Sequence, residues 1–451
     1  MSLQFITGNS GNGKTKYLFN RIVKEAKENP RDNYLVIVPE QFTMQTQRQL
    51  VDLSENKAIM NIDVLSFKRL AYRVFDELGI TNLTVLEETG KNLVLRKLAA
   101  QEADKLGVIG RNLNRIGYIS EVKSLLSELV QYNISPEELG RYIASGRLSD
   151  TLSDKLKDVL VLYEAFEKFM QDKYITAEEI LNVLSNVAEE SAILRNSVIA
   201  FDEFTGFTPI QNQLIKKLFV ISKKIYVTLT IDCREDIFKS RGMQELFDMP
   251  KRTVKSLTEM AAFYGIEVEE PIILDKNYRL AENEELSFME QQLFRKRRCS
   301  FEKVPKHIHI DCLLDPKQEL TKIARRINEL VRNENLRYRD IAIVTGDVNI
   351  YAGYVREIFD KYNIPYFIDA TQEILFHPFI EFIRSIPDIA AQNFSADAVF
   401  RFLRCGFSEL LDSEIDVLEN YVLACGVRGK SAWDKKWVRL PKHKAGYDLE
   451  L

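Results

Sequence analysis

Residues 8–15 read Gly-Asn-Ser-Gly-Asn-Gly-Lys-Thr and complete the pattern G-x-x-x-x-G-K-[ST] directly after the apolar run 3–6. In this pattern glycine-rich backbone N–H groups curl around phosphates at a helix N-terminus, so a strand must precede the loop and a helix must follow it. The sequence predicts both, a strand over 3–7 and a helix over 14–28. A chance glycine-rich turn is the alternative, but it does not explain that order. The feature predicts a strand–loop–helix unit that binds a nucleotide.

The loop residues have separate expected roles. Lys14 is expected to reach the β- and γ-phosphates as a catalytic residue, and the Thr15 hydroxyl to ligate Mg²⁺. ATP and Mg²⁺ are therefore the expected cofactors. The expected nucleotide-binding residues are those of the whole loop: Gly8, Asn9, Ser10, Gly11, Asn12, Gly13, Lys14 and Thr15.

The pattern after the loop predicts an α/β protein. Short continuous apolar runs, which suit a parallel sheet covered on both faces, alternate with helical patterns. The predicted strands are 3–7, 34–38, 59–65, 196–201 and 224–230, and the predicted helices are 14–28, 42–53, 66–78 and 209–221. Between the third and fourth strands, residues 87–195 are amphipathic without a convincing strand, which predicts an all-helical insertion.

A second α/β unit is predicted further along the chain. Its expected strands are 308–312, 340–344 and 366–368, with a helix over 316–333 and a helical pattern after 375. A chain of 451 residues fits two to four such domains.

Composition narrows the class of protein. The chain is 45% hydrophobic and 28% charged, has no apolar run of about 18 residues, and begins with a polar stretch, so we expect a cytoplasmic protein without a membrane partner. Its five cysteines are scattered and form no C-x-x-C pair, which predicts buried, reduced thiols. A net charge of −4 restricts any nucleic-acid contact to local groups such as 295–298 or Lys435-Lys436, which alone are more typical of solvated surface.

An acidic pair follows the predicted strand that ends at Phe201. In a phosphate-loop protein Asp202 would hold Mg²⁺, and Glu203 would polarise the attacking water. An acidic pair after a strand is a weak signal alone. Its coupling to the loop in one sheet makes Asp202 and Glu203 the expected catalytic partners of Lys14.

Three segments resemble motifs of the superfamily 1A helicases, the UvrD/PcrA/RecB-like group. Ser66-Phe67 resembles motif Ib, 201–204 resembles motif II, and Asn277-Tyr278-Arg279 resembles motif IV. The resemblance implies that Arg279 is a catalytic arginine that reaches the γ-phosphate across a cleft between two RecA-like domains. Its alternative role is that of an exposed residue at a helix start.

Further segments are similar to the AddB (RexB) family, which supplies one of the helicase/deoxyribonuclease subunits of bacterial AddAB-type complexes. They are 38–43, 204–209, 337–342, 364–369 and His377-Pro378. The resemblance implies a heterodimer with AddA (RexA), contact with double-strand DNA ends and single strands, and recognition of the Chi signal. It also implies a RecA-like P-loop domain over 1–85 and 196–275, a helical insertion over 86–195, the start of a second RecA-like domain over 276–375, and a helical segment over 376–451.

This sequence departs from the active helicases of the group. Motif III carries a glutamine in those enzymes, whereas residues 231–236 read Ile-Asp-Cys-Arg-Glu-Asp, and no glutamine motif precedes Gly8. AddB-like chains often carry a non-acidic residue at the position of Glu203. The acidic Glu203 is therefore a possible departure from that family, and in this respect the chain resembles the active helicases. A helicase-fold scaffold that binds DNA and AddA without ATP turnover therefore stays an alternative, as does a small-molecule P-loop kinase.

The resemblance also implies that the sequence is an N-terminal fragment. AddB-like proteins end in a nuclease domain with a 4Fe-4S cluster. By this resemblance the cluster and motif VI are expected only in the C-terminal part of the full-length protein.

Two further groups of residues have a chemical and a structural interpretation. His307 and His309 lie on one face of a predicted strand, where a metal site lacks a third ligand and a surface strand is the better interpretation. Phe42, Phe67 and Phe204 could stack on single-stranded bases, but core packing is favoured.

Overall fold

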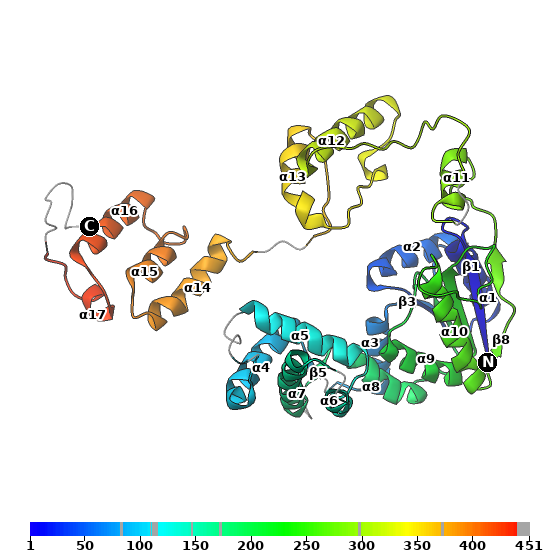
Figure 1. The fold of residues 1–451 in the computed structure, drawn as a ribbon, viewed down its shortest axis with the longest axis horizontal. Helices are drawn as coiled ribbons and strands as arrows, with labels where there is room; N and C mark the ends of the chain where they lie inside the picture. The colour runs from blue at the N-terminus through cyan, green and yellow to red at the C-terminus, as the bar shows by residue number, and fades with distance from the viewer. Residues whose placement is uncertain are drawn as a thin grey trace. The chain divides into compact units, whose positions relative to one another are not determined.

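The computed structural model describes residues 1–81, 84–108, 110, 116–145, 148–170, 174–295, 299–370 and 374–439. Of the basic run 295–298, only Arg295 is among them. The chain divides into two compact units, Met1–His309 and Ile310–Leu451, and each is described by itself (Figure 1).

A parallel sheet of seven strands forms the centre of the first unit. The strand order is β3-β2-β6-β7-β1-β8, and β9 also pairs with β1. The strands are β1 (Ser2–Gly8), β2 (Tyr34–Ile37), β3 (Ile62–Leu65), β6 (Val198–Phe201), β7 (Lys224–Thr230), β8 (Glu267–Val268) and β9 (Ile272–Leu274). The five predicted strands are confirmed, and the insertion does separate β3 from β6 in sequence. The sequence analysis missed β8 and β9, which have two and three residues and too little periodicity to detect.

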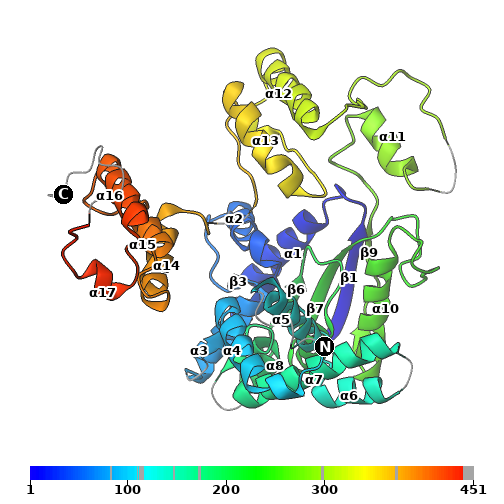
Figure 2. The same ribbon diagram turned by 60° about the vertical axis from the view of Figure 1, so that its left-hand side comes forward.

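Helices cover both faces of this sheet, as Figure 2 shows for α1 and α10 on either side of β1. Alternate strand residues point to opposite faces, so Phe5 lies in one apolar cluster and Ile6 in the other. One face packs on α1 (Lys14–Glu28) and α2 (Thr43–Leu53). The opposite face packs on α3 (Phe67–Leu78), α8 (Ile180–Val187), α9 (Pro209–Ile221) and α10 (Asp248–Phe263). Burial on both faces explains why the strands are continuous apolar runs.

The insertion has an apolar core of its own, centred on residues such as Leu126 and Leu162. Its helices are α4 (Glu88–Gln101), α5 (Ile116–Gln131), α6 (Pro136–Ala144) and α7 (Asp150–Met170). The expectation that it holds no strand is wrong, because β4 (Val85–Leu86) and β5 (Ile175–Thr176) pair in parallel where the chain enters and leaves it. Pairing of only two residues gives no periodic signal in the sequence.

The second unit contains helices α12 (Pro316–Asn333), α13 (Val348–Lys361), α14 (Pro378–Ala391), α15 (Ala396–Leu403), α16 (Asp412–Cys425) and α17 (Lys430–Trp433). One more helix, α11 (Glu284–Gln292), belongs to the first unit. Short 3-10 turns occur in both units, at Glu40–Phe42, Ala103–Lys105, Ala188–Glu190 and Tyr338–Asp340. Among the described residues, no helix is long and apolar enough to cross a membrane.

The three strands predicted for the region 308–368 are wrong. Residues 308–312, 341–344 and 366–368 belong to no strand, and Ile310, Val344 and Phe367 are 94%, 92% and 88% exposed. A strand exists only through hydrogen bonds to a neighbour, and within the described residues these segments have no partner strand. An apolar run therefore gives strand propensity but not a strand. The prediction that the cysteines are buried is also wrong, because Cys299 and Cys312 are exposed and the other three are only partly buried, although all five are free thiols as predicted.

Candidate nucleotide-binding site

The predicted phosphate loop connects β1 to α1. Gly13 immediately precedes α1 with a φ of 78°, and Gly11 has a φ of 90°. Residues with a side chain avoid this left-handed region, so the glycines allow the chain to turn tightly into the helix. The first turn of α1 then presents backbone N–H groups at the positive end of the helix, which is a suitable environment for an anion.

A segment from the far end of the first unit lies against this loop, and we call residues 274–279 the strap. The Tyr278 N–H donates to the Gly11 carbonyl at 3.0 Å, and the Asn12 side-chain amide donates to the Leu274 carbonyl at 2.6 Å. A Cβ atom on Gly11 would lie only 2.7 Å from the Asn277 side-chain oxygen. The loop and the strap are therefore in close contact, and glycine is required at that position.

The strap brings Arg279 to the loop. Arg279 Nη1 lies 3.4 Å from Ser10 Oγ, and the Asn277 side chain donates to the Ser10 carbonyl at 3.0 Å. Asn277 Oδ1 also accepts from the Arg279 N–H at 3.1 Å, which fixes the turn that carries the guanidinium. A predicted site arginine thus lies beside the loop, within the same unit.

Lys14 extends along the loop. Its Nζ donates to the Gly8 carbonyl at 3.1 Å and to the Asn9 carbonyl at 3.0 Å. Burial lowers the pKa of this ammonium, and the nearby carboxylates Asp202 and Glu203 oppose that shift. A partly buried cation whose hydrogen bonds within the described residues go to neutral carbonyls would gain from an anionic ligand.

The acidic pair follows β6 and faces the loop. Asp202 is 1% exposed, and its Oδ1 accepts from the Thr228 hydroxyl. Its Oδ2 is buried and has no hydrogen-bond partner among the described residues, and burial raises the pKa of the carboxyl group. Thr15 Oγ1 donates to Glu203 Oε1 at 3.4 Å, and Glu203 has a φ of 63°. Such a backbone conformation costs about 1–3 kcal/mol for a residue with a side chain and is most frequent at functional sites.

These residues fit a magnesium ion. A buried carboxylate oxygen without a partner and a neighbouring threonine hydroxyl are hard oxygen ligands of the kind Mg²⁺ prefers. A divalent cation would also offset the unfavourable burial of the Asp202 charge.

A cavity of about 740 Å³ joins the loop, the acidic pair and the strap. The predicted residues that line it are Ser10, Gly11, Gly13, Lys14, Thr15, Asp202, Glu203 and Arg279. Gly8, Asn9 and Asn12 lie in the loop but are not among its lining residues. The sequence analysis missed Tyr278, whose exposed ring lines the cavity beside Gly13, and Thr228, which orients Asp202. Thr228 could have been found as a polar residue between the apolar residues Val227 and Leu229 of β7.

The other candidates do not form sites. Phe67 is 7% exposed, and its ring centroid lies 5.6 Å from that of Phe204 in an aromatic cluster of the core, which agrees with the packing interpretation. Phe42 likewise packs against the core on the other face. His307 lies beside Glu285 at 3.4 Å, the strand proposed to hold both histidines is absent, and no metal-ligand cluster occurs in the described part of the chain.

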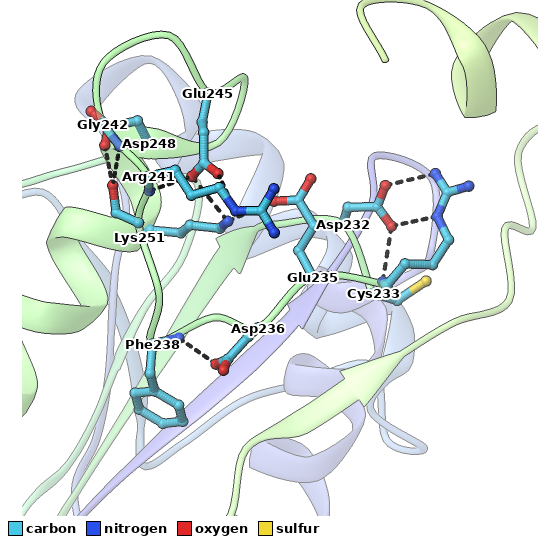
Figure 3. Close-up of polar contacts among 12 residues, drawn as sticks. Asp232, Cys233, Glu235, Asp236, Phe238, Arg241, Gly242, Glu245, Asp248 and Lys251 are labelled. Atoms are coloured by element: carbon cyan, nitrogen blue, oxygen red, sulfur yellow. Dashed lines mark hydrogen bonds and ion pairs between the residues drawn. The ribbon is translucent and has the colours of Figure 1, made fainter. Parts of the chain in front are cut away.

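The loop after β7 contains residues 231–236, where the family resemblance led us to expect motif III. Asp232 is 2% exposed and binds Arg234 Nη2 at 2.6 Å and the Arg295 guanidinium. Glu235 binds Lys251 Nζ at 2.6 Å. We call this set of ion pairs the β7-loop network and define it as Asp232, Arg234, Glu235, Lys251 and Arg295. Figure 3 shows Asp232, Glu235 and Lys251 among the polar residues of this loop. Its charges are paired with one another, which holds the loop in one conformation.

Comparison with known proteins shows the family to which the chain belongs. Residues 5–290 match the family model described as ADDB, N-terminal. The chain belongs to this AddB family. Proteins named as a subunit of an ATP-dependent helicase/deoxyribonuclease are similar to it throughout: 39% identical over 100% of the chain in Lachnoclostridium phytofermentans, 35% over 97% in Clostridium tetani and 33% over 100% in Clostridioides difficile. The chain spans only 40%, 38% and 39% of these relatives.

Proposed function

We propose that the chain is the N-terminal, helicase-like part of an AddB-type subunit, and that its first unit binds ATP with Mg²⁺. The observation that carries the proposal is the cavity in which the phosphate loop, the acidic pair and Arg279 meet. These groups come from sequence positions more than 260 residues apart, since Arg279 and Ser10 are separated by 269 residues. A chance glycine-rich turn does not account for that convergence.

We further propose that the first unit is a RecA-like domain. Support comes from its parallel sheet, with helices on both faces and the loop at the carboxyl end of β1, which is where open α/β sheets bind ligands.

The roles of the site residues follow from their chemistry. Backbone N–H groups of the loop would bind phosphate oxygens, and Lys14 would leave the Gly8 and Asn9 carbonyls for the phosphates. Asp202 and Thr15 would hold Mg²⁺, which supplies charge neutralisation on the phosphates. Arg279 would add a planar donor to the terminal phosphate, and Glu203 would orient water.

DNA and an AddA subunit are the proposed partners. The relatives are named as subunits of a helicase/deoxyribonuclease, which supports a role in processing double-strand DNA ends. Chi recognition and nuclease activity would belong to the complete assembly.

One observation favours a second candidate, a scaffold that binds nucleotide without productive turnover. The β7 loop lacks the glutamine expected in motif III, and its acidic residues Asp232 and Glu235 are neutralised by Arg295 and Lys251. Steady ATP hydrolysis by the complete heterodimer that is lost in Asp202→Ala would exclude the scaffold.

The proposal is tested by equilibrium titration of ATP and Mg²⁺ into the chain and into Lys14→Ala. Removal of a charge-assisted contact should weaken binding by about 10- to 100-fold. Lys24→Ala is the matched control, because Lys24 is an exposed lysine on the same helix and does not line the cavity. Equal affinity of all three proteins would refute the proposal. Single-stranded DNA titrated at two salt concentrations tests the DNA contact, because phosphate contacts make the affinity fall with salt.

A further inference from the structure

Asn9 is the one phosphate-loop residue whose side chain joins two other elements. It is 6% exposed and is not among the residues that line the nucleotide cavity. Its Oδ1 accepts from the Cys233 N–H in the β7 loop at 3.1 Å, and its Nδ2 donates to Glu290 Oε1 on α11 at 2.6 Å. The oxygen and the nitrogen of the Asn9 side-chain amide are therefore both hydrogen-bonded, one to the β7 loop and the other to α11.

Both elements are themselves well fixed. Cys233 lies between Asp232 and Arg234, so its N–H belongs to a loop held by the β7-loop network. Arg295, which follows α11, binds Asp232 and lies 3.3 Å from Glu235, and thereby ties α11 to the same network. Figure 3 shows Asp232 and Cys233 side by side at the start of this loop. A shift of the Asn9 amide would therefore displace groups that move together.

α11 also anchors the chain that leads to the second unit. Glu285 accepts from the backbone N–H groups of Lys306 and His307 at 2.7 and 2.8 Å, and the second unit begins at Ile310. Any movement of α11 reaches the segment that enters that unit.

The backbone of Asn9 contacts the residue that must respond to phosphate. Lys14 Nζ donates to the Asn9 carbonyl at 3.0 Å, and a turn of this ammonium toward bound phosphates would lengthen or break that bond. The carbonyl of Asn9 would then have different hydrogen-bond partners in the free and the nucleotide-bound loop. A ligand shifts a structure only through such a difference in contacts.

We propose that Asn9 is a positioning residue that transmits occupancy of the phosphate loop to the β7 loop and to α11. The inference rests on the proposed nucleotide binding. In this chain the direct bond between Asn9 and the Cys233 N–H provides a connection between phosphate loop and β7 loop that needs no motif III glutamine.

The test is hydrogen exchange of the full chain, with and without saturating adenylyl imidodiphosphate and Mg²⁺. In the wild type, exchange of peptides over 231–236 and 284–292 should slow by about fivefold when the analogue binds. In Asn9→Ala that slowing should disappear at an analogue concentration that saturates the variant, which its separately measured affinity fixes. The control is Asn20→Ala, at an exposed position of α1, which should behave as the wild type.

A pair of variants separates transmission from mere packing. Asn9→Asp can still accept from Cys233 but opposes the Glu290 carboxylate, so slowing over 284–292 should be lost while that over 231–236 persists. Asn9→Asp/Glu290→Gln exchanges donor and acceptor and should restore the slowing over 284–292. This rescue keeps the test decisive if Asn9→Ala fails to fold.

The outcomes are distinguishable. Affinity for the analogue is measured separately, and a wild type that does not bind it refutes the proposed function together with this inference. A wild type that binds without any slowing over 231–236 and 284–292, or an Asn9→Ala variant with the full slowing, overturns the inference alone. Failure of Asn9→Asp/Glu290→Gln to recover the response overturns it as well.

Discussion

Gly11→Ala tests the close contact between the phosphate loop and the strap. Gly11 has a φ of 90°, and an added Cβ would lie 2.7 Å from Asn277 Oδ1 and 2.8 Å from Arg279 Cβ. Real Cβ atoms do not approach other atoms so closely, so the strap must move away. That movement would separate Arg279 from Ser10, the contact on which the proposed role of the arginine depends.

The magnitude follows from three terms. An alanine in this left-handed region costs about 1 kcal/mol relative to glycine. Displacement of the strap loses the bond from the Tyr278 N–H to Gly11 and the bond from Asn277 to Ser10, both at 3.0 Å and each contributing about 1 kcal/mol. We expect a total loss of about 3 kcal/mol in the free energy of unfolding of the first unit.

Gly79→Ala is the matched control. Gly79 has a φ of 68° at the end of α3, but no atom lies within 4 Å of its ideal Cβ position. The Gly79→Ala variant therefore has the conformational cost of an alanine in this region but no steric clash. We expect it to lose about 1 kcal/mol in the free energy of unfolding.

Hydrogen exchange of the slowest amides in β1 measures the free energy of unfolding of the first unit. The two tryptophans, Trp433 and Trp437, are both in the second unit, so their fluorescence during urea unfolding should not change in either variant. Equal destabilisation by Gly11→Ala and Gly79→Ala would refute the argument, because it would mean that the strap does not press on the loop.

Two further predictions concern buried charges. Because burial raises the pKa of Asp202 above its ordinary 3.8, the folded state retains the proton longer than the unfolded state, so stability without metal should fall as pH rises above that value. Asp202→Asn should remove this fall in stability. Differential scanning calorimetry at pH 7 should show that Mg²⁺ raises the melting temperature of the wild type but not that of the variant. An identical response of both proteins to Mg²⁺ would contradict the metal assignment. In the insertion, the Lys91 side chain is 3% exposed, and its Nζ lies 2.7 Å from a Glu178 carboxylate oxygen. Glu178→Gln should therefore destabilise α4 by about 2–3 kcal/mol, as measured by hydrogen exchange of its amides. An unchanged exchange rate would show that Glu88 alone compensates the Lys91 charge.

The site was predictable where local pattern and chemistry coincide. The loop at 8–15 and the pair Asp202-Glu203 each follow an apolar strand, and parallel strands bring their carboxyl ends to one edge, so the sequence alone indicated that these groups meet. The location of Arg279 came from family resemblance, since nothing in its neighbourhood indicates that the strap returns to the loop.

Side-chain contacts between distant residues away from the carboxyl ends of the strands could not be predicted. Asn9 and Glu290 are 281 residues apart, and Asp232 and Arg295 are 63 residues apart, so neither pair leaves a periodic signal. The wrong strands in the second unit have the opposite cause. Their apolar runs satisfy the local criterion for a strand, but pairing depends on a partner that local sequence does not contain.

The central claim is that the glycine-rich loop binds the phosphates of a nucleotide through its backbone and Lys14. Isothermal titration of the chain with ATP, ADP and adenosine, all with Mg²⁺, tests it most directly. The account predicts that affinity decreases from ATP to ADP and that adenosine binds at least about 100-fold more weakly than ATP, because several charge-assisted hydrogen bonds are lost. Adenosine binding as tightly as ATP, or no binding of ATP, would contradict it.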